Sequence, residues 1–256
     1  MKKEFLRVSI IFLAAVLLIP IMRVHGAENY WYVKRNADHK QPACDPNLAY
    51  IEDFGGLYVD KSHGDNNPQK VIYLTFDAGY ENGNVEKIMD VLKEEGIKGS
   101  FFILGNLIER NPELVKRMAE EGHLVCNHTV NHRNLTCADE EKFKAEVEGL
   151  EKMYYDLTGK EMSKYFRPPE GTFSENLLKI ANKLGYKTVF WSFAYADWDN
   201  GAQMGEEAAL KKILDNIHNG ENMLLHPTSA TNAKIMKRLI GELKQQGYRF
   251  ATLDEL

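Results

Sequence analysis

The chain has few cysteines, and this scarcity limits what holds it together. Cys44, Cys126 and Cys137 are the only three among 256 residues, and none is close enough in sequence to another to form a paired metal motif. An odd number of thiols allows at most one disulfide bond. We expect Cys126 to be a small buried residue in a strand.

An excess of basic residues is also missing, which argues against a nucleic-acid partner. The 32 lysine and arginine residues stand against 37 aspartate and glutamate residues, a formal net charge of -5 at pH 7. No basic stretch could neutralise phosphates, and no glycine-rich phosphate loop is present. With 44% hydrophobic and 27% charged residues, the composition instead fits one ordinary globular domain, neither disordered nor built from repeats.

The N-terminus carries the pattern of an export signal. Basic residues at positions 2, 3 and 7 precede an apolar run from about Val8 to Met22, and small residues follow around Gly26. The run is short for a membrane span and contains Pro20, so we expect cleavage near Gly26; retention as an uncleaved anchor is the alternative. In both cases the remaining chain acts outside the cytoplasm.

Beyond this signal or anchor, residues 1–26, the sequence divides into an arm and a domain. Residues 27–70 are polar and rich in turn-forming residues, with little periodicity, as in an irregular arm. Over residues 71–256, short apolar runs alternate with amphipathic segments. The apolar runs predict seven strands, at Val71–Phe76, Ser100–Leu104, Leu124–Asn127, Tyr165–Arg167, Thr188–Phe193, Met223–Leu225 and Tyr248–Leu253. The amphipathic segments predict helices at Gly83–Glu95, Pro112–Glu121, Glu140–Leu157, Glu175–Leu184, Glu206–Asn219 and Asn232–Gln246.

This alternation predicts the fold class. Parallel pairing with helices on the outside is the expected result, so the sequence indicates an α/β barrel or an open α/β sheet. Several helical patterns close with a glycine that can form a left-handed cap, as at Gly96 and Gly247. In both architectures the chemistry collects at the carboxyl ends of the strands.

Polar or titratable side chains stand at almost every one of these strand ends. A single histidine in such a place is more often a structural hydrogen-bonding residue than a catalyst. The recurrence of acid-base residues at equivalent positions instead predicts that they converge on one pocket. The residues are Asp77, His128, His132, Arg167, Asp197, Trp198 and His226.

The spacing of His128 and His132 points more directly to a chemical role than that of the other residues. Four residues apart, they would lie on one face of a helical turn and could bind one metal ion, although two surface histidines have the same spacing. With Asp77 at a neighbouring strand end, metal-assisted hydrolysis becomes the leading reaction class.

Five short motifs in order carry a family resemblance. The segments "TFDAG", "HTVNH", "RPPEG", "DW" and "LLH" resemble the motifs of the polysaccharide deacetylase family, the NodB homology domain or carbohydrate esterase 4. The similarity covers about residues 71–256. It implies a distorted (β/α)7 barrel, in agreement with the seven strands predicted independently.

The longer segments "YLTFDAGYENG", "RPPEGTFSE" and "LGYKTVFWSFAYADW" are similar to the delta-lactam-biosynthetic de-N-acetylases of that family. The resemblance implies removal of the acetyl group from N-acetylmuramic acid in peptidoglycan, which leads to the muramic delta-lactam of the spore cortex. The partner would be the glycan strand, paired in function with an amidase that removes stem peptides. The place of action would be the forespore or cortex wall space. Oligomeric state is open.

The resemblance also implies a role for each site residue. Asp77 is the general base and Arg167 orients it; His226 is the general acid and Asp197 orients it. A divalent metal, zinc by preference, binds His128 and His132. Glu170, Trp191 and Trp198 contact substrate, although core packing explains either tryptophan equally well. The backbone N–H near Glu170 assists the oxyanion.

Two positions depart from the family pattern and keep alternatives open. Ala78 replaces a carboxylate that ligates the metal in most members, so we expect a weakened metal site unless Glu81 or Asn82 fills the place. Glu170 stands where a lactam-pathway enzyme has a basic residue, and if it faced the sugar it would repel the lactyl carboxylate of muramic acid. The alternatives are therefore a deacetylase of N-acetylglucosamine or chitin-type substrates, and a catalytically weakened glycan-binding protein.

Overall fold

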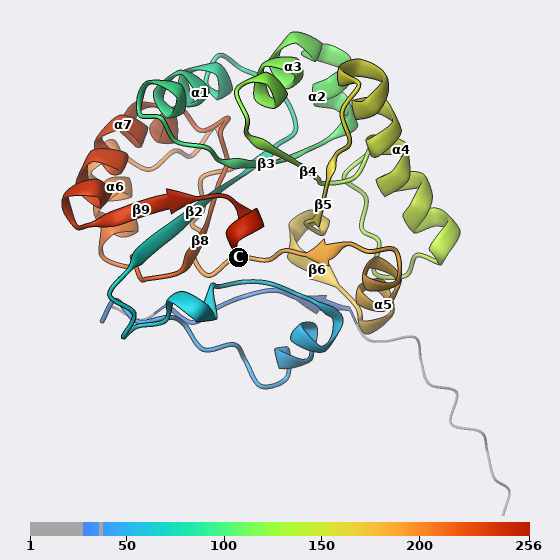
Figure 1. Cartoon of the computed structure of the whole chain (residues 1–256), viewed down its shortest axis with the longest axis horizontal. Helices are drawn as coiled ribbons and strands as arrows, with labels where there is room; N and C mark the ends of the chain where they lie inside the picture. Colours follow the sequence, from blue (N-terminus) through green and yellow to red (C-terminus); the bar gives the residue numbers. More distant parts are fainter. Residues whose placement is uncertain (1–27, 36–37) are drawn as a thin grey trace, which may run out of the picture.

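The protein folds as an α/β barrel whose strands form one parallel sheet (Figure 1). The structure is a computed structural model that describes residues 28–35 and 38–256. The predicted signal or anchor, residues 1–26, lies outside the described residues. Within the described part, no helix is long and apolar enough to cross a membrane. The helices surround the strands, as the alternating sequence pattern predicts (Figure 1).

The sheet has seven strands in the order β7-β5-β4-β3-β2-β8, with β9 paired to the first half of β2. The strands are β2 (Lys70–Ala78), β3 (Ser100–Ile103), β4 (Leu124–Asn127), β5 (Ser163–Phe166), β7 (Lys187–Thr188), β8 (Glu221–Leu225) and β9 (Tyr248–Ala251). A separate antiparallel pair joins β1 (Asn29–Tyr30) to β6 (Thr172–Phe173). All seven predicted strands therefore have a counterpart, six of them within a few residues at their ends.

Seven α-helices and four short 3₁₀ helices occur in the described residues. The α-helices are α1 (Val85–Glu94), α2 (Gly105–Arg110), α3 (Pro112–Glu120), α4 (Glu140–Thr158), α5 (Glu175–Lys183), α6 (Glu206–Leu214) and α7 (Ala230–Gln245). The 3₁₀ helices are η1 (Ala49–Phe54), η2 (Lys61–His63), η3 (Pro169–Gly171) and η4 (Leu253–Glu255). The predicted glycine caps are confirmed, since Gly96 and Gly247 have φ of 68° and 83°.

Three features differ from the sequence predictions. The short helix α2 has no counterpart among them. Helix α6 ends at Leu214, five residues before the predicted end, because His218 and Asn219 instead bond the turn that leads into β8. The predicted strand Thr188–Phe193 is reduced to the end of β7, because the backbone beyond Thr188 bonds to the arm. The cysteines are free thiols, with Cys126 buried in β4 as predicted.

The arm helps to close the barrel between the two edges of the sheet. Strands β7 and β8 lie at opposite ends of the strand order. Residues 192–193, which follow β7, bond β8 directly, and Phe193 forms a parallel bridge with Met223. Leu57 N donates to the carbonyl of Thr188 at 2.8 Å, and the Leu57 carbonyl accepts from Phe190 N at 2.7 Å. Two residues later, Val59 forms an antiparallel bridge with Glu221 at the start of β8. Residues 57–59 thus join both edges of the sheet.

Aromatic packing anchors the beginning of the arm beside the loop that follows β5. Trp31 is 5% exposed, stacks on Phe190 at 4.6 Å between ring centroids and donates from Nε1 to the Trp191 carbonyl at 2.8 Å. The pairing of β1 with β6 holds the same region from the other side. Burial of a tryptophan of this size contributes strongly to packing, so the arm is an integral part of the folded barrel.

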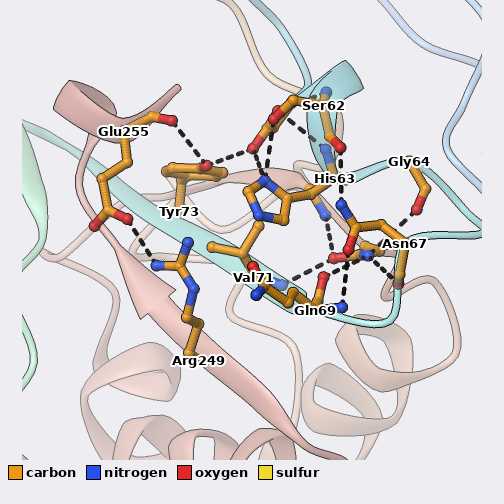
Figure 2. A network of polar contacts seen from close by, with 12 residues as sticks. Ser62, His63, Gly64, Asn67, Gln69, Val71, Tyr73, Arg249 and Glu255 are labelled. Atoms are coloured by element: carbon orange, nitrogen blue, oxygen red, sulfur yellow. Dashed lines mark hydrogen bonds and ion pairs between the residues drawn. The ribbon is translucent and has the colours of Figure 1, made fainter.

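A polar network fixes the end of the arm to the end of the barrel where β2 begins (Figure 2). Tyr73 of β2 donates its hydroxyl to Asp60 Oδ2 at 2.6 Å, and His63 Nδ1 lies 2.6 Å from the same oxygen. Asn219 accepts from Val71 N at 2.8 Å and donates to carbonyls of the arm, including that of Gln69 at 2.9 Å. These bonds satisfy backbone groups that the irregular arm leaves unpaired.

Candidate active site

The side chains predicted to carry the chemistry lie together at the carboxyl ends of the strands. Asp77 is the penultimate residue of β2, and His128 directly follows β4. Arg167 directly follows β5, and His226 directly follows β8. Parallel strands bring these ends to the same end of the barrel. Asp197, in the loop after β7, reaches the group through its contact with His226. The predicted convergence is therefore present.

Arg167 and Asp77 form a buried ion pair at the centre of the site. Nη1 of the fully buried Arg167 donates to Asp77 Oδ1 at 2.7 Å. The guanidinium also donates to Thr75 Oγ1 at 2.9 Å and lies over the ring of Phe102. Burial raises the pKa of Asp77, but the charge of Arg167 and the neighbouring imidazoles outweigh it, so this pKa lies below its ordinary value. Asp77 is a carboxylate of fixed orientation at neutral pH.

His128 is held with one nitrogen free to act as a ligand. Its Nδ1 lies 2.8 Å from the backbone carbonyl of Arg167. A carbonyl only accepts, so Nδ1 carries the hydrogen and Nε2 presents a lone pair, 3.5 Å from Asp77 Oδ2. Burial lowers the pKa of His128 to about 4, which keeps the imidazole neutral. A neutral, oriented imidazole is the form that binds metals.

The helical turn predicted for His128 and His132 is wrong, because the two residues lie in a loop after β4. The loop still brings the rings to 4.9 Å between centroids. His132 has a φ of 55°, and its backbone N–H donates to Thr129 Oγ1 at 2.8 Å. The carboxylate of Glu146 on α4 accepts from both N and Nδ2 of Asn131, each at 2.9 Å. Side-chain bonds therefore fold this loop in place of a helix.

Glu81 and Asn82 are the two candidates to supply the ligand that Ala78 lacks, and both side chains form hydrogen bonds to other groups. Ala78 itself is fully buried in the apolar core. Glu81 Oε2 accepts from Glu86 N at 3.1 Å, at the start of α1. Asn82 Nδ2 donates to the carbonyl of Thr228 at 2.9 Å. Glu81 is thus engaged within its own loop, and Asn82 joins that loop to the one after β8.

The donor set fits a divalent cation at His128 and His132, with few protein ligands. In residues 28–35 and 38–256, no group of three or more His, Cys, Asp or Glu side chains is arranged to hold a metal ion. The lone pair of His128 Nε2 and the nearby charge of Asp77 nevertheless supply the chemistry that such an ion requires. Catalytic zinc sites usually have three protein ligands, and the methyl side chain of Ala78 offers no ligand atom.

His226 and Asp197 form a second coupled pair. His226 Nδ1 lies 2.7 Å from Asp197 Oδ1, and His226 N donates to Asp197 Oδ2 at 2.8 Å. Burial lowers the pKa of His226, but the hydrogen bond and charge of Asp197 outweigh it, so the pKa lies above its ordinary value of 6.5. Trp198 lies beside this pair, with its ring 6.1 Å from the imidazole and its side chain exposed.

The loop after Arg167 brings Glu170 and Trp191 to the same region. Glu170 is exposed and has a φ of 58°. Gly171 follows with a φ of 66°, and a Cβ there would lie 2.6 Å from Trp191 Cη2. Only glycine therefore lets this loop pack directly on the half-buried indole, whose ring centroid lies 6.0 Å from the Arg167 guanidinium carbon. Trp191 supports the loop, whereas Glu170 faces solvent.

Sequence reasoning missed two side chains that hold the site. Thr75 anchors Arg167, and its position two residues before Asp77 on one strand face is a signal that could have identified it. Glu146 holds the loop of His132 from the middle of α4, and nothing in its sequence context distinguishes it from a surface glutamate.

A family model for polysaccharide deacetylases matches residues 64–189. The peptidoglycan-N-acetylmuramic acid deacetylase PdaA of Bacillus subtilis is 40% identical over 227 residues, which cover 88% of this chain and 84% of that protein. The chain belongs to the polysaccharide deacetylase family. The solved structure of PdaA, a family 4 carbohydrate esterase, matches this deacetylase with a TM-score of 0.84 and 38% identity, covering 90% of this chain and 96% of that one. The predicted barrel type is thereby confirmed.

Other relatives of this polysaccharide deacetylase differ in substrate and in activity. A peptidoglycan-N-acetylglucosamine deacetylase of Bacillus cereus is 34% identical over 194 residues, covering 74% of this chain and 89% of that protein. A family 4 pseudoenzyme of Bacillus anthracis has a TM-score of 0.68 and 25% identity, covering 74% of this chain and 66% of that one. The polysaccharide deacetylase described here is a hydrolase of amide bonds, and deacetylases of its family generally depend on a metal.

Proposed function

We propose that this deacetylase removes the acetyl group from N-acetylmuramic acid in peptidoglycan, the step that leads to muramic delta-lactam in the spore cortex. The observation that carries the substrate is the similarity to PdaA, which extends over 88% of this chain and includes the arm. The assembled site, with Asp77 and His226 on separate strands, supports the reaction. An export signal, the wall space as place of action and an amidase that first strips stem peptides complete this proposal.

The reaction requires a general base and a general acid, and two different side chains supply them. Asp77, kept ionised by Arg167, takes a proton from the attacking water at its carboxylate. His226, kept protonated by Asp197, gives a proton to the departing amine. A divalent cation held by His128 and His132 would polarise the acetamide carbonyl and favour ionisation of the water. Trp198 beside His226 offers an aromatic surface to the sugar.

The reaction is expected to have a bell-shaped pH profile. Asp77 must be ionised, His128 neutral and His226 protonated. As the pH falls, protons compete with the cation for His128 and neutralise Asp77, whose pKa lies below its ordinary value of 3.8, so activity ends. As the pH rises, deprotonation of His226 ends activity above pH 6.5. Measurement of kcat/KM across both limbs checks this, and an alkaline limb below 6.5 contradicts the role of His226.

Zinc is the proposed metal, bound weakly because Ala78 supplies no ligand. We expect a chelator to abolish acetate release, zinc to restore it, and simple dialysis to remove much of the metal. Zinc binding to the stripped chain, measured by calorimetry, should be lost in a His128→Ala variant. Full acetate release after complete metal removal would contradict the proposed metal site.

The substrate is tested by comparing acetate release from peptide-free peptidoglycan strands with release from chitin oligomers. The proposal predicts release from the first substrate and little from the second. The reverse result would favour an N-acetylglucosamine deacetylase, a function supported by the Bacillus cereus relative and by the exposed carboxylate of Glu170. Binding without release from either substrate would favour a glycan-binding protein; the relative from Bacillus anthracis is a pseudoenzyme of the same family.

A further inference from the structure

Asn232 is a buried polar residue that contacts both members of the pair formed by His226 and Asp197. Its side chain is fully buried in the first turn of α7. Nδ2 donates to Asp197 Oδ2 at 2.6 Å and to the backbone carbonyl of His226 at 3.1 Å. Both hydrogens of the amide are therefore used, one on each partner.

The orientation of this amide is determined by its surroundings. A carboxylate oxygen and a carbonyl oxygen face one end, and both only accept, so that end must be Nδ2. The opposite end, Oδ1, accepts from the hydroxyl of Tyr195, which is itself buried. Since all three groups of the amide have partners, it cannot rotate without loss of a buried hydrogen bond.

We propose that Asn232, held by Tyr195, is a positioning residue that fixes the Asp197 carboxylate against Nδ1 of His226. The inference rests on the proposed function of His226. Asp197 Oδ2 receives Asn232 Nδ2 and His226 N, which leaves Oδ1 pointing at the ring nitrogen. Nδ1 then keeps its hydrogen, and Nε2 becomes the nitrogen that exchanges a proton with the leaving group. In the described residues Nε2 has no other protein partner.

A purely structural role in starting helix α7 does not explain the contacts of the Asn232 side chain. The helix start is capped by Ser229, whose Oγ accepts from the backbone N–H of Asn232 at 3.1 Å. The cap therefore uses the backbone of Asn232 and would survive a change of its side chain. Among residues 28–35 and 38–256, the amide itself bonds only Asp197, His226 and Tyr195.

The test compares the Asn232→Leu and Tyr195→Phe variants of the full chain with a Thr231→Val control. Leucine has the same branching at Cγ as asparagine but carries two methyl groups in place of the amide oxygen and nitrogen. Thr231 lies in the same turn of α7 and donates Oγ1 to the Met204 carbonyl at 2.7 Å, so the control loses one bond without touching the pair. Two readouts are needed, the kinetics of acetate release and the NMR titration of the His226 ring in the metal-free chain.

We expect Asn232→Leu to lower kcat by about 10- to 100-fold with little change in KM, and Tyr195→Phe to have a smaller effect in the same direction. The pKa of His226 should fall in Asn232→Leu and stay unchanged in Thr231→Val. The other charges near this ring, Asp77 and Arg167, are the same in all variants. A kcat within about twofold of the unchanged chain, or an unchanged His226 titration, would overturn the proposal.

The two readouts separate this inference from the proposed function. If the unchanged chain releases no acetate from any substrate, but the His226 titration shifts in Asn232→Leu alone, the proposed function fails and the positioning role remains. If acetate is released but the variant matches Thr231→Val in both readouts, the positioning role fails and the function remains.

Discussion

The Asp77→Asn variant is expected to release acetate about 10²- to 10⁴-fold more slowly than the unchanged chain, the usual contribution of a positioned general base. Asparagine has the shape of aspartate, and its Oδ1 can still accept from Arg167 Nη1, so the site should remain assembled. It cannot take a proton from water at neutral pH. The loss should therefore appear in kcat, with KM for the glycan and the unfolding temperature nearly unchanged.

An Asp90→Asn variant provides the control for this experiment. Asp90 is exposed and pairs with Arg117 on the helical surface, so its replacement removes a carboxylate of the same kind away from the site. Its rate of acetate release should equal that of the unchanged chain. If Asp77→Asn retained its full rate as well, Asp77 would not be the base, and another group would have to accept the proton.

The Arg167→Met variant is expected to be less stable by about 3–5 kcal/mol, the cost of leaving one partner of a buried ion pair without the other. Methionine retains apolar volume, but the donors to Asp77 and Thr75 are lost. Asp77 would then be a charge in a buried place with fewer partners. The free energy of unfolding, measured by denaturant titration, reports this loss.

The pH dependence of that loss identifies its cause. In the unchanged chain the pKa of Asp77 is lowered, so its stabilising contribution is present above the unfolded pKa and is lost as the pH falls through the folded value. Without Arg167, only the neighbouring imidazoles oppose burial, so this pKa rises. The variant should therefore recover part of its stability as the pH falls toward the raised value, and the double variant with Asp77→Asn should be less destabilised than the sum of the two changes.

An Arg238→Met variant controls for the general effect of removing an arginine. Arg238 pairs with Glu207 between α7 and α6, and both side chains are exposed. Pairs of this kind contribute little to stability, so no measurable change in the unfolding midpoint is expected. A stability loss in Arg167→Met that matched this control, or that did not depend on pH, would mean that the buried pair is not what holds Asp77.

Short-range periodicity made the barrel predictable, together with the strand ends that carry the candidate catalytic residues. Each apolar run is a few residues long and each amphipathic helix follows directly, so the pattern is contained within neighbouring residues. Parallel pairing then places every strand end at the same end of the barrel, which is why Asp77, Arg167 and His226 could be grouped before any contact was known. The contact of Arg167 with Asp77 spans 90 residues of sequence, yet the strand order alone brings it about.

The loop after β4 was harder to predict, for a physical reason. The four-residue spacing of His128 and His132 is shared by helices and by compact loops, and periodicity cannot distinguish them over five residues. The loop conformation is selected by Glu146 of α4, whose carboxylate accepts from Asn131 N, and by the hydroxyl of Thr129, which accepts from His132 N. Side-chain bonds to the backbone compete with helix formation in this way.

By itself, the sequence determined the α/β alternation, the left-handed glycine caps, the family and the residues that stand at the strand ends, because each is recorded in local spacing. Only the tertiary structure decided that residues 57–59 of the arm bond both β7 and β8, and that Asn232 bonds the pair formed by His226 and Asp197. These contacts join irregular segments or single polar atoms that lie far apart in the chain. They follow no period, so they are fixed only when packing brings the partners together and burial makes an unpaired polar group costly.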